Sequence, residues 1–213
     1  MPNIVKVEPT ESVFTINWFL DLYCNFDCMY CPSYFHSKDK THKTFDQLVK
    51  FWLDILSKTS KKNLKYKISF TGGEVTTNKN FLPFLQWLDT NYGDIIQSMG
   101  FTTNGSAPLR YYIKAIKIPS ISYISFSTHS EFFNENKFFN TIVLLHKDVI
   151  ELNKSMHVNI MNEYWNNNEI LVYSKYLKNK NIPFSINEID YSVKIRDFYI
   201  ENKNNKRYNF NDQ

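Results

Sequence analysis

The 213-residue sequence is poor in cysteine, with only three. All three lie between positions 24 and 31, and this odd, clustered set argues against a disulfide framework and favours a reduced metal site. No apolar stretch is long enough to cross a bilayer, and residues 1–11 lack the basic-then-apolar pattern of a secretory signal. We therefore expect a cytoplasmic protein with no membrane segment.

The composition is that of a globular protein, with 43% hydrophobic and 22% charged residues, which excludes wholesale disorder, collagen and low-complexity architectures. The length predicts a single domain over 1–213, with a core at about 14–189 and a partly disordered tail at about 200–213. The net charge of +4 is spread along the chain and does not indicate nucleic-acid binding.

Strand-like and helix-like patterns alternate along the chain. Six strands are expected, at 14–20, 66–71, 98–103, 121–127, 156–161 and 183–186, and between them helices at about 44–57, 81–88, 109–116, 138–152 and 168–177. This order predicts βαβ units and a parallel sheet, either doubly wound or in an open, incomplete barrel. In both arrangements chemistry belongs at the carboxyl ends of the strands, where the unusual residues of this sequence lie.

The three cysteines occupy the first, fifth and eighth positions of one loop, at Cys24, Cys28 and Cys31. Thiolates at this spacing can hold zinc or an iron–sulfur cluster, and three of them leave one coordination position open. His36 could close a structural Cys3His zinc site. A third interpretation, three cysteines packed as small hydrophobic residues, fits a loop poorly.

The stretch CNFDCMYC over residues 24–31 resembles the CxxxCxxC loop of the radical S-adenosylmethionine (SAM) superfamily, including the aromatic Tyr30 before the last cysteine. Gly72, Gly73 and Glu74, after the second expected strand, resemble the GGE motif of that family. The resemblance covers about 14–189. It implies an α/β fold, a partial (βα)6 TIM-like barrel with parallel strands and outer helices.

The resemblance also implies a cofactor site. Cys24, Cys28 and Cys31 would bind a [4Fe-4S] cluster, and the amino and carboxylate groups of SAM would chelate its open iron. The two glycines would let the backbone approach the methionine moiety, since glycine has no Cβ. The expected SAM-binding residues are Tyr30, Gly72, Gly73, Glu74, Thr103, Asn104, Ser127, His129, Asn159 and Asn162. His129 stands where some relatives have an acidic residue, which leaves its role open between a substrate contact and an ordinary loop side chain.

As for function, the resemblance implies an enzyme that cleaves SAM reductively to a 5′-deoxyadenosyl radical, which abstracts hydrogen from a small-molecule or peptide substrate. Such an enzyme needs an external one-electron reductant such as flavodoxin or ferredoxin. The alternative is a non-catalytic Cys3His zinc or iron–sulfur protein for binding or electron transfer. The GGE turn favours the enzyme, because a structural zinc loop does not need it.

Two further groups of residues are candidates for contacts near the site. Glu188, Asp190 and Tyr191, at the end of the last expected strand, are candidates for substrate contact, with a solvated loop as the alternative. Tyr34, Phe35 and His36 extend the cysteine loop and would line the pocket mouth or cover the cluster from water. No cysteine remains for a second cluster.

Overall fold

The structure is a computed structural model, which describes residues 12–28, 30–31, 40–59, 64–162 and 167–189. Its strands are β1 Ser12–Phe19, β2 Leu64–Thr71, β3 Ile96–Thr103, β4 Ile121–Ser127, β5 Ser155–Asn162 and β6 Phe184–Glu188. Its helices are α1 Phe45–Thr59, α2 Phe81–Tyr92, α3 Leu109–Ile116, α4 Glu135–Glu151 and α5 Asn167–Asn179, with a 3-10 turn η2 at Val75–Thr77.

The expected alternation of strands and helices is confirmed, with ends that differ by a few residues. β4 and α3 have the expected bounds. The start of α4 differs, because the side chain of Asn134 accepts a hydrogen bond from the backbone N–H of Lys137 and caps the helix at Glu135. The hydrophobic periodicity identified only the part of this helix that contacts the core.

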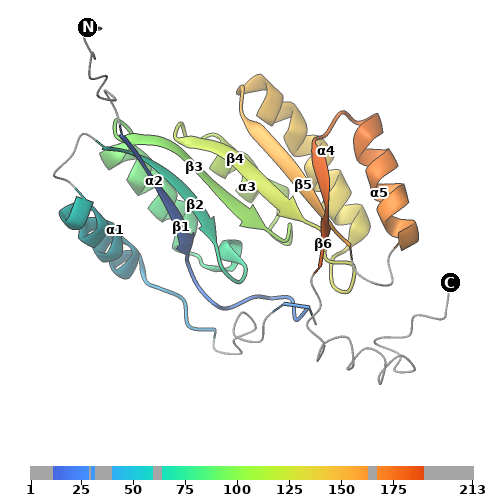
Figure 1. Ribbon diagram of the computed structural model, residues 1–213, viewed down its shortest axis with the longest axis horizontal. Helices are drawn as coiled ribbons and strands as arrows, with labels where there is room; N and C mark the ends of the chain where they lie inside the picture. The colour runs from blue at the N-terminus through green and yellow to red at the C-terminus, as the bar shows by residue number, and fades with distance from the viewer. Residues whose placement is uncertain (1–11, 29, 32–39, 60–63, 163–166, 190–213) are drawn as a thin grey trace, which may run out of the picture.

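The six strands form one parallel sheet in the order β1-β2-β3-β4-β5-β6. Sequential order with parallel pairing means that each connection crosses over in the same direction, which curls the sheet instead of winding it to both sides. Figure 1 shows the strands side by side in a curved sheet, with the helices along its outer side. Within the described residues β1 and β6 do not pair, so the barrel is open, and the expected partial TIM-like fold is confirmed.

The core lies between the sheet and the helices. Strands β1 to β5 each bury apolar side chains on this side, and aromatic rings fill much of the space. Trp18 of β1 packs edge-on against Phe84 of α2, with ring centroids 5.5 Å apart, and Phe81 meets Phe101 of β3 at 5.5 Å. All four side chains are at most 4% exposed. Burial of such rings contributes about 2–3 kcal/mol each, which makes this layer the main source of stability.

The opposite face of the sheet is polar near its β4–β6 end. Asn159 of β5 donates from Nδ2 to Ser125 Oγ of β4 at 2.8 Å, and Ser185 Oγ of β6 donates to Asn159 Oδ1 at 3.2 Å. These hydrogen bonds run across three neighbouring strands and join side chains instead of packing them. Near β4 to β6, side chains on the inner face of the half-barrel are therefore joined by hydrogen bonds, whereas the outer face of the sheet packs through apolar side chains.

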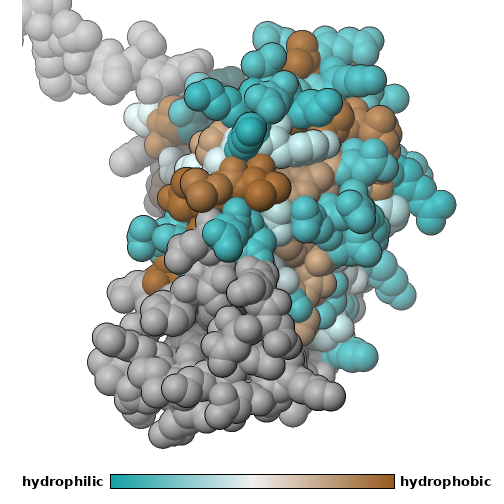
Figure 2. Space-filling view, turned by 90° about the vertical axis from the view of Figure 1, so that its right-hand side faces the viewer, coloured by the Kyte–Doolittle hydropathy of each residue, from teal (hydrophilic) through white to brown (hydrophobic). Residues whose placement is uncertain are grey.

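The β6 end of the molecule carries exposed apolar side chains. Figure 2 faces this end and shows hydrophobic residues among hydrophilic ones. The exposed large hydrophobic residues of α5 and β6 are Leu171, Val172, Tyr176 and Ile186. In the described part of the chain, none of the helices has the length and apolar character required to span a bilayer.

Candidate functional site

A cavity of about 130 Å³ lies at the carboxyl ends of β1 to β4. Ten of the thirteen predicted cofactor and metal residues line it: Cys24, Cys28, Cys31, Gly72, Gly73, Glu74, Thr103, Asn104, Ser127 and His129. Three further lining residues were not predicted, Phe26, Thr71 and Thr102. The parallel sheet explains the grouping, since strands that run the same way end at the same edge.

The sulfurs of Cys24 and Cys28 have hydrogen-bond partners within the loop and in distant parts of the chain. The Cys24 sulfur accepts from the backbone N–H of Phe26 at 3.4 Å and from Asn104 Nδ2 at 3.8 Å. The Cys28 sulfur lies 3.5 Å from Nδ1 of His129. No disulfide joins any two of the three cysteines, all of which the structure describes.

Burial changes the acidity of these thiols. It raises the pKa of Cys24 above its ordinary value of 9.0. It also raises the pKa of Cys31 to about 11, with a smaller contribution from the nearby charge of Cys24. A thiol must lose its proton to bind a metal, so loading of this loop releases protons and is favoured as the pH rises.

The turn at Gly72 and Gly73 packs directly on the chain that enters the cysteine loop. Gly73 donates its N–H to Asp21 O at 2.9 Å, and Glu74 donates its N–H to Tyr23 O at 2.8 Å. A Cβ on Gly72 would lie 2.3 Å from Asp21 O, and one on Gly73 would lie 2.0 Å from Tyr23 O. Gly72 also has a φ of +137°, which side chains disfavour. Glycine is thus required here by backbone packing, a reason that the sequence did not predict.

The Glu74 side chain, 1% exposed, holds the ends of β2 and β3 together. Its Oε1 accepts hydrogen bonds from Thr76 N at 3.0 Å, Thr76 Oγ1 at 2.6 Å and Thr103 Oγ1 at 2.8 Å. Its Oε2 accepts from the backbone N–H of Asn104 at 2.6 Å. Burial raises the pKa of this carboxyl, and the four hydrogen bonds oppose that shift. The carboxylate therefore acts as a brace for the Thr103–Asn104 turn.

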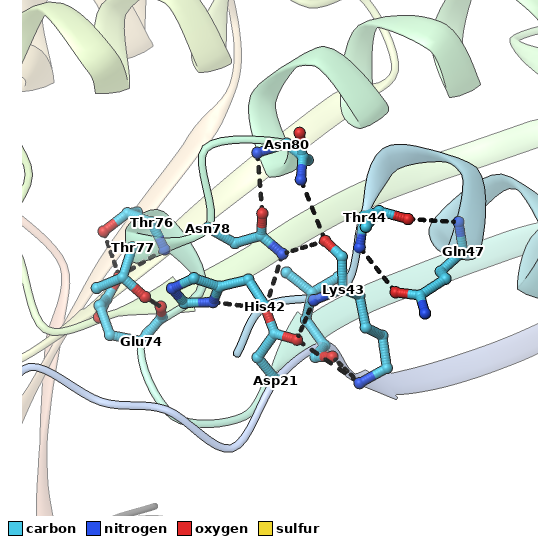
Figure 3. Close-up of polar contacts among 11 residues, drawn as sticks. Asp21, His42, Lys43, Thr44, Gln47, Glu74, Thr76, Thr77, Asn78 and Asn80 are labelled. Atoms are coloured by element: carbon cyan, nitrogen blue, oxygen red, sulfur yellow. Dashed lines mark hydrogen bonds and ion pairs between the residues drawn. The ribbon is translucent and has the colours of Figure 1, made fainter. Parts of the chain in front are cut away.

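Asp21 holds the start of the cysteine segment against the residues that precede α1, a role that the sequence analysis did not predict. Its carboxylate, on a side chain only 4% exposed, lies 3.0 Å from His42 Nδ1 and 3.6 Å from Lys43 Nζ. It also accepts from Lys43 N at 3.1 Å and from Asn78 Nδ2 at 2.7 Å (Figure 3). The segment that leaves β1 thereby meets the segment that enters α1. The position of Asp21 directly after the first expected strand, three residues before the first cysteine, could have indicated this role from the sequence.

His129 and Tyr30 form a stacked pair against the cysteine loop. Their ring centroids lie 6.0 Å apart with an interplanar angle of 8°, and Tyr30 OH makes a hydrogen bond with His129 Nδ1. Phe26 packs edge-on against the imidazole at 5.9 Å. Burial lowers the pKa of His129 to about 4, so the imidazole is neutral at pH 7.

Three predicted SAM contacts lie outside the described lining of the cavity. Tyr30 turns its hydroxyl to His129, Asn159 bonds within the sheet as above, and Asn162 donates to Glu188 Oε1 at 3.1 Å. Their assignment to SAM, like that of the residues in the lining, stays a prediction. Tyr34, Phe35, His36, Asp190 and Tyr191 lie outside the described residues.

The donor set fits an iron–sulfur cluster. Three thiols line one cavity, and the Cys24 sulfur accepts from two N–H groups, donors of the kind that stabilise ligating sulfur. Among the described residues, no three histidine, cysteine or acidic side chains converge closely enough to hold one metal ion. Three thiolates that face one cavity can ligate a multi-iron group, in which each cysteine binds a different iron.

Comparisons with known proteins agree with this arrangement at the level of the fold. No protein-family model matches the chain, and none of the curated proteins matches it. Among solved structures, SuiB from Streptococcus suis bound to the precursor peptide SuiA is similar, with a TM-score of 0.57 and 17% identity over 92% of this chain and 46% of that one. The structure of anSMEcpe with bound AdoMet is also similar, with a TM-score of 0.59 and 16% identity over 93% of this chain and 60% of that one. The chain thus spans about half the length of these proteins.

Proposed function

We propose that this chain, which has the fold of the radical SAM enzymes, is an enzyme of that class. The observation that carries the proposal is the meeting of three thiols and the Gly72–Gly73–Glu74 turn on one cavity at the carboxyl ends of the strands. The fold alone supports many functions, but this cavity combines soft metal ligands with a tight glycine turn. The alternative, a structural metal loop, explains the thiols and the packed glycine turn, but it has no use for the cavity beside them, which the polar strand-end residues Thr103, Asn104 and Ser127 also line.

The chain's own residues would provide the binding site. Cys24, Cys28 and Cys31 would hold a [4Fe-4S] cluster, which when bound supplies the electron that cleaves SAM to methionine and a 5′-deoxyadenosyl radical. The Gly72–Gly73 turn and the strand ends braced by Glu74 would form the wall against which SAM lies. The cavity is partly enclosed by Phe26 and His129, which limits the access of water to the reacting groups.

The test is anaerobic reconstitution of the protein with iron and sulfide, followed by reduction in the presence of SAM. We expect a brown protein with about four irons per chain, the content of a single cubane, that forms 5′-deoxyadenosine and methionine. Replacement of any one cysteine by alanine should abolish both the colour and the cleavage. A colourless protein that retains zinc, and that loses its fold after His36→Ala, would establish the structural-metal alternative.

The partners follow from the same proposal. SuiB is similar to this chain and holds a precursor peptide, which supports a peptide substrate over a small molecule. An external one-electron donor such as flavodoxin or ferredoxin would reduce the cluster. A peptide encoded beside this gene should, if it is the substrate, increase 5′-deoxyadenosine formation and change mass after incubation with the reduced enzyme and SAM.

A further inference from the structure

His129 reaches the cysteine loop from a point 101 positions away in the sequence. It follows β4 by two residues, and its Nδ1 lies 3.5 Å from the sulfur of Cys28, within hydrogen-bond range for sulfur. Two rings fix the imidazole in place, Tyr30 stacked on it and Phe26 edge-on to it. This contact therefore has a defined geometry and belongs to a packed cluster, with Cys28 itself only 4% exposed.

The chemistry of the three groups decides the direction of the hydrogen bond. A cysteine sulfur that ligates iron is a thiolate and can only accept. The hydroxyl of Tyr30 can donate or accept, so it does not require the lone pair of Nδ1. The tautomer with its proton on Nδ1 is the one that can donate to the sulfur of Cys28, with the hydroxyl oxygen of Tyr30 accepting from the same N–H. In the competing arrangement Tyr30 donates to Nδ1, and the sulfur receives nothing from His129.

We propose that His129 donates a hydrogen bond from Nδ1 to the ligating sulfur of Cys28 and thereby raises the reduction potential of the iron–sulfur site. This inference rests on the proposed function and goes beyond it, because it assigns His129 to the metal ligand and not to SAM or substrate. The physical reason is that the reduced site carries more negative charge, which a donor on sulfur stabilises more than it stabilises the oxidised site.

The experiment compares the reconstituted wild-type protein with three variants in a redox titration followed by electron paramagnetic resonance. His129→Phe keeps a ring for the contacts with Tyr30 and Phe26 and removes the donor. His129→Asn keeps a donor close to the position of Nδ1. Tyr30→Phe removes the competing hydroxyl and leaves the imidazole in place. Iron and sulfide contents are measured for each protein.

We expect His129→Phe to shift the midpoint potential to a more negative value at unchanged iron content. His129→Asn should return the midpoint potential most of the way to the wild-type value. Tyr30→Phe should keep the wild-type potential or raise it. A second readout does not depend on the Phe variant. Wild-type protein labelled with [15N]histidine should show a nitrogen hyperfine coupling to the reduced cluster, and labelled His129→Asn should lack it.

Equal potentials in wild-type and His129→Phe, or no 15N coupling in the labelled wild-type, would overturn the inference and leave the proposed function intact. A potential that falls equally in Tyr30→Phe would assign the effect to loop packing and would also overturn it. Failure of the wild-type protein to form any cluster would overturn the proposed function and this inference together.

Discussion

Glu74→Gln separates the role of Glu74 as a brace from a role as a SAM contact. All four partners of the carboxylate are donors, three on Oε1 and one, the backbone N–H of Asn104, on Oε2. The least costly orientation of the glutamine places its NH2 at Oε2, where it faces the N–H of Asn104 and leaves a buried donor unpaired. Such a group costs about 1–3 kcal/mol. For a chain of this size about 2 kcal/mol corresponds to a melting temperature lower by roughly 6 °C.

The assay is thermal unfolding of the metal-free protein without SAM, with Glu151→Gln, at an exposed position, as the control. The direction in which the stability changes with pH follows from the raised pKa of Glu74. The folded state binds the proton more tightly than the unfolded state, so this group stabilises the fold most below pH 4.5 and less as the pH rises through its folded pKa. Protonated Glu74 keeps an acceptor lone pair on its hydroxyl oxygen for the N–H of Asn104, which the NH2 of glutamine lacks, so the difference in melting temperature from the glutamine variant should widen on acidification. Equal melting temperatures for both variants and the wild type, with only SAM affinity reduced, would refute the brace.

Three further outcomes are expected. Asp21→Ala should lower the free energy of unfolding by about 2–3 kcal/mol, because it removes one of the two acceptors of the buried Asn78 Nδ2 group and leaves a buried donor unpaired; chemical denaturation measures this, and an unchanged midpoint would contradict it. Gly73→Val should reduce iron uptake as well as SAM binding, since its Cβ would clash with Tyr23 O. Full iron content in that variant would show that the turn can shift without disturbing the cysteine loop. Cys31 in metal-free protein should react with iodoacetamide at pH 8 about 100-fold more slowly than a thiol with the ordinary pKa of 9.0, and the rate should climb until about pH 11; a plateau near pH 9 would contradict the shift.

The sequence alone determined the fold class and the location of the chemistry. The period of two in β1 and the three- and four-residue steps in α1 depend only on which face of each element is buried, so they can be read locally. Alternation of such elements limits the topology to a parallel sheet, and a parallel sheet places all its carboxyl ends at one edge. The cysteine spacing and the GGE motif are also local, which is why the cysteines and the glycine turn were found before the structure.

The tertiary structure decided what each polar group touches. Glu74 was expected beside SAM, and only the register of β2 with β3 shows that its carboxylate caps the Thr103–Asn104 turn. His129 meets Cys28 across 101 positions, and Asp21 meets Asn78 across 57, contacts that no local pattern encodes. Side-chain partners of this kind depend on strand register and helix packing over the whole chain. Periodicity determines which face of an element is buried, and the packed structure determines which atoms meet there.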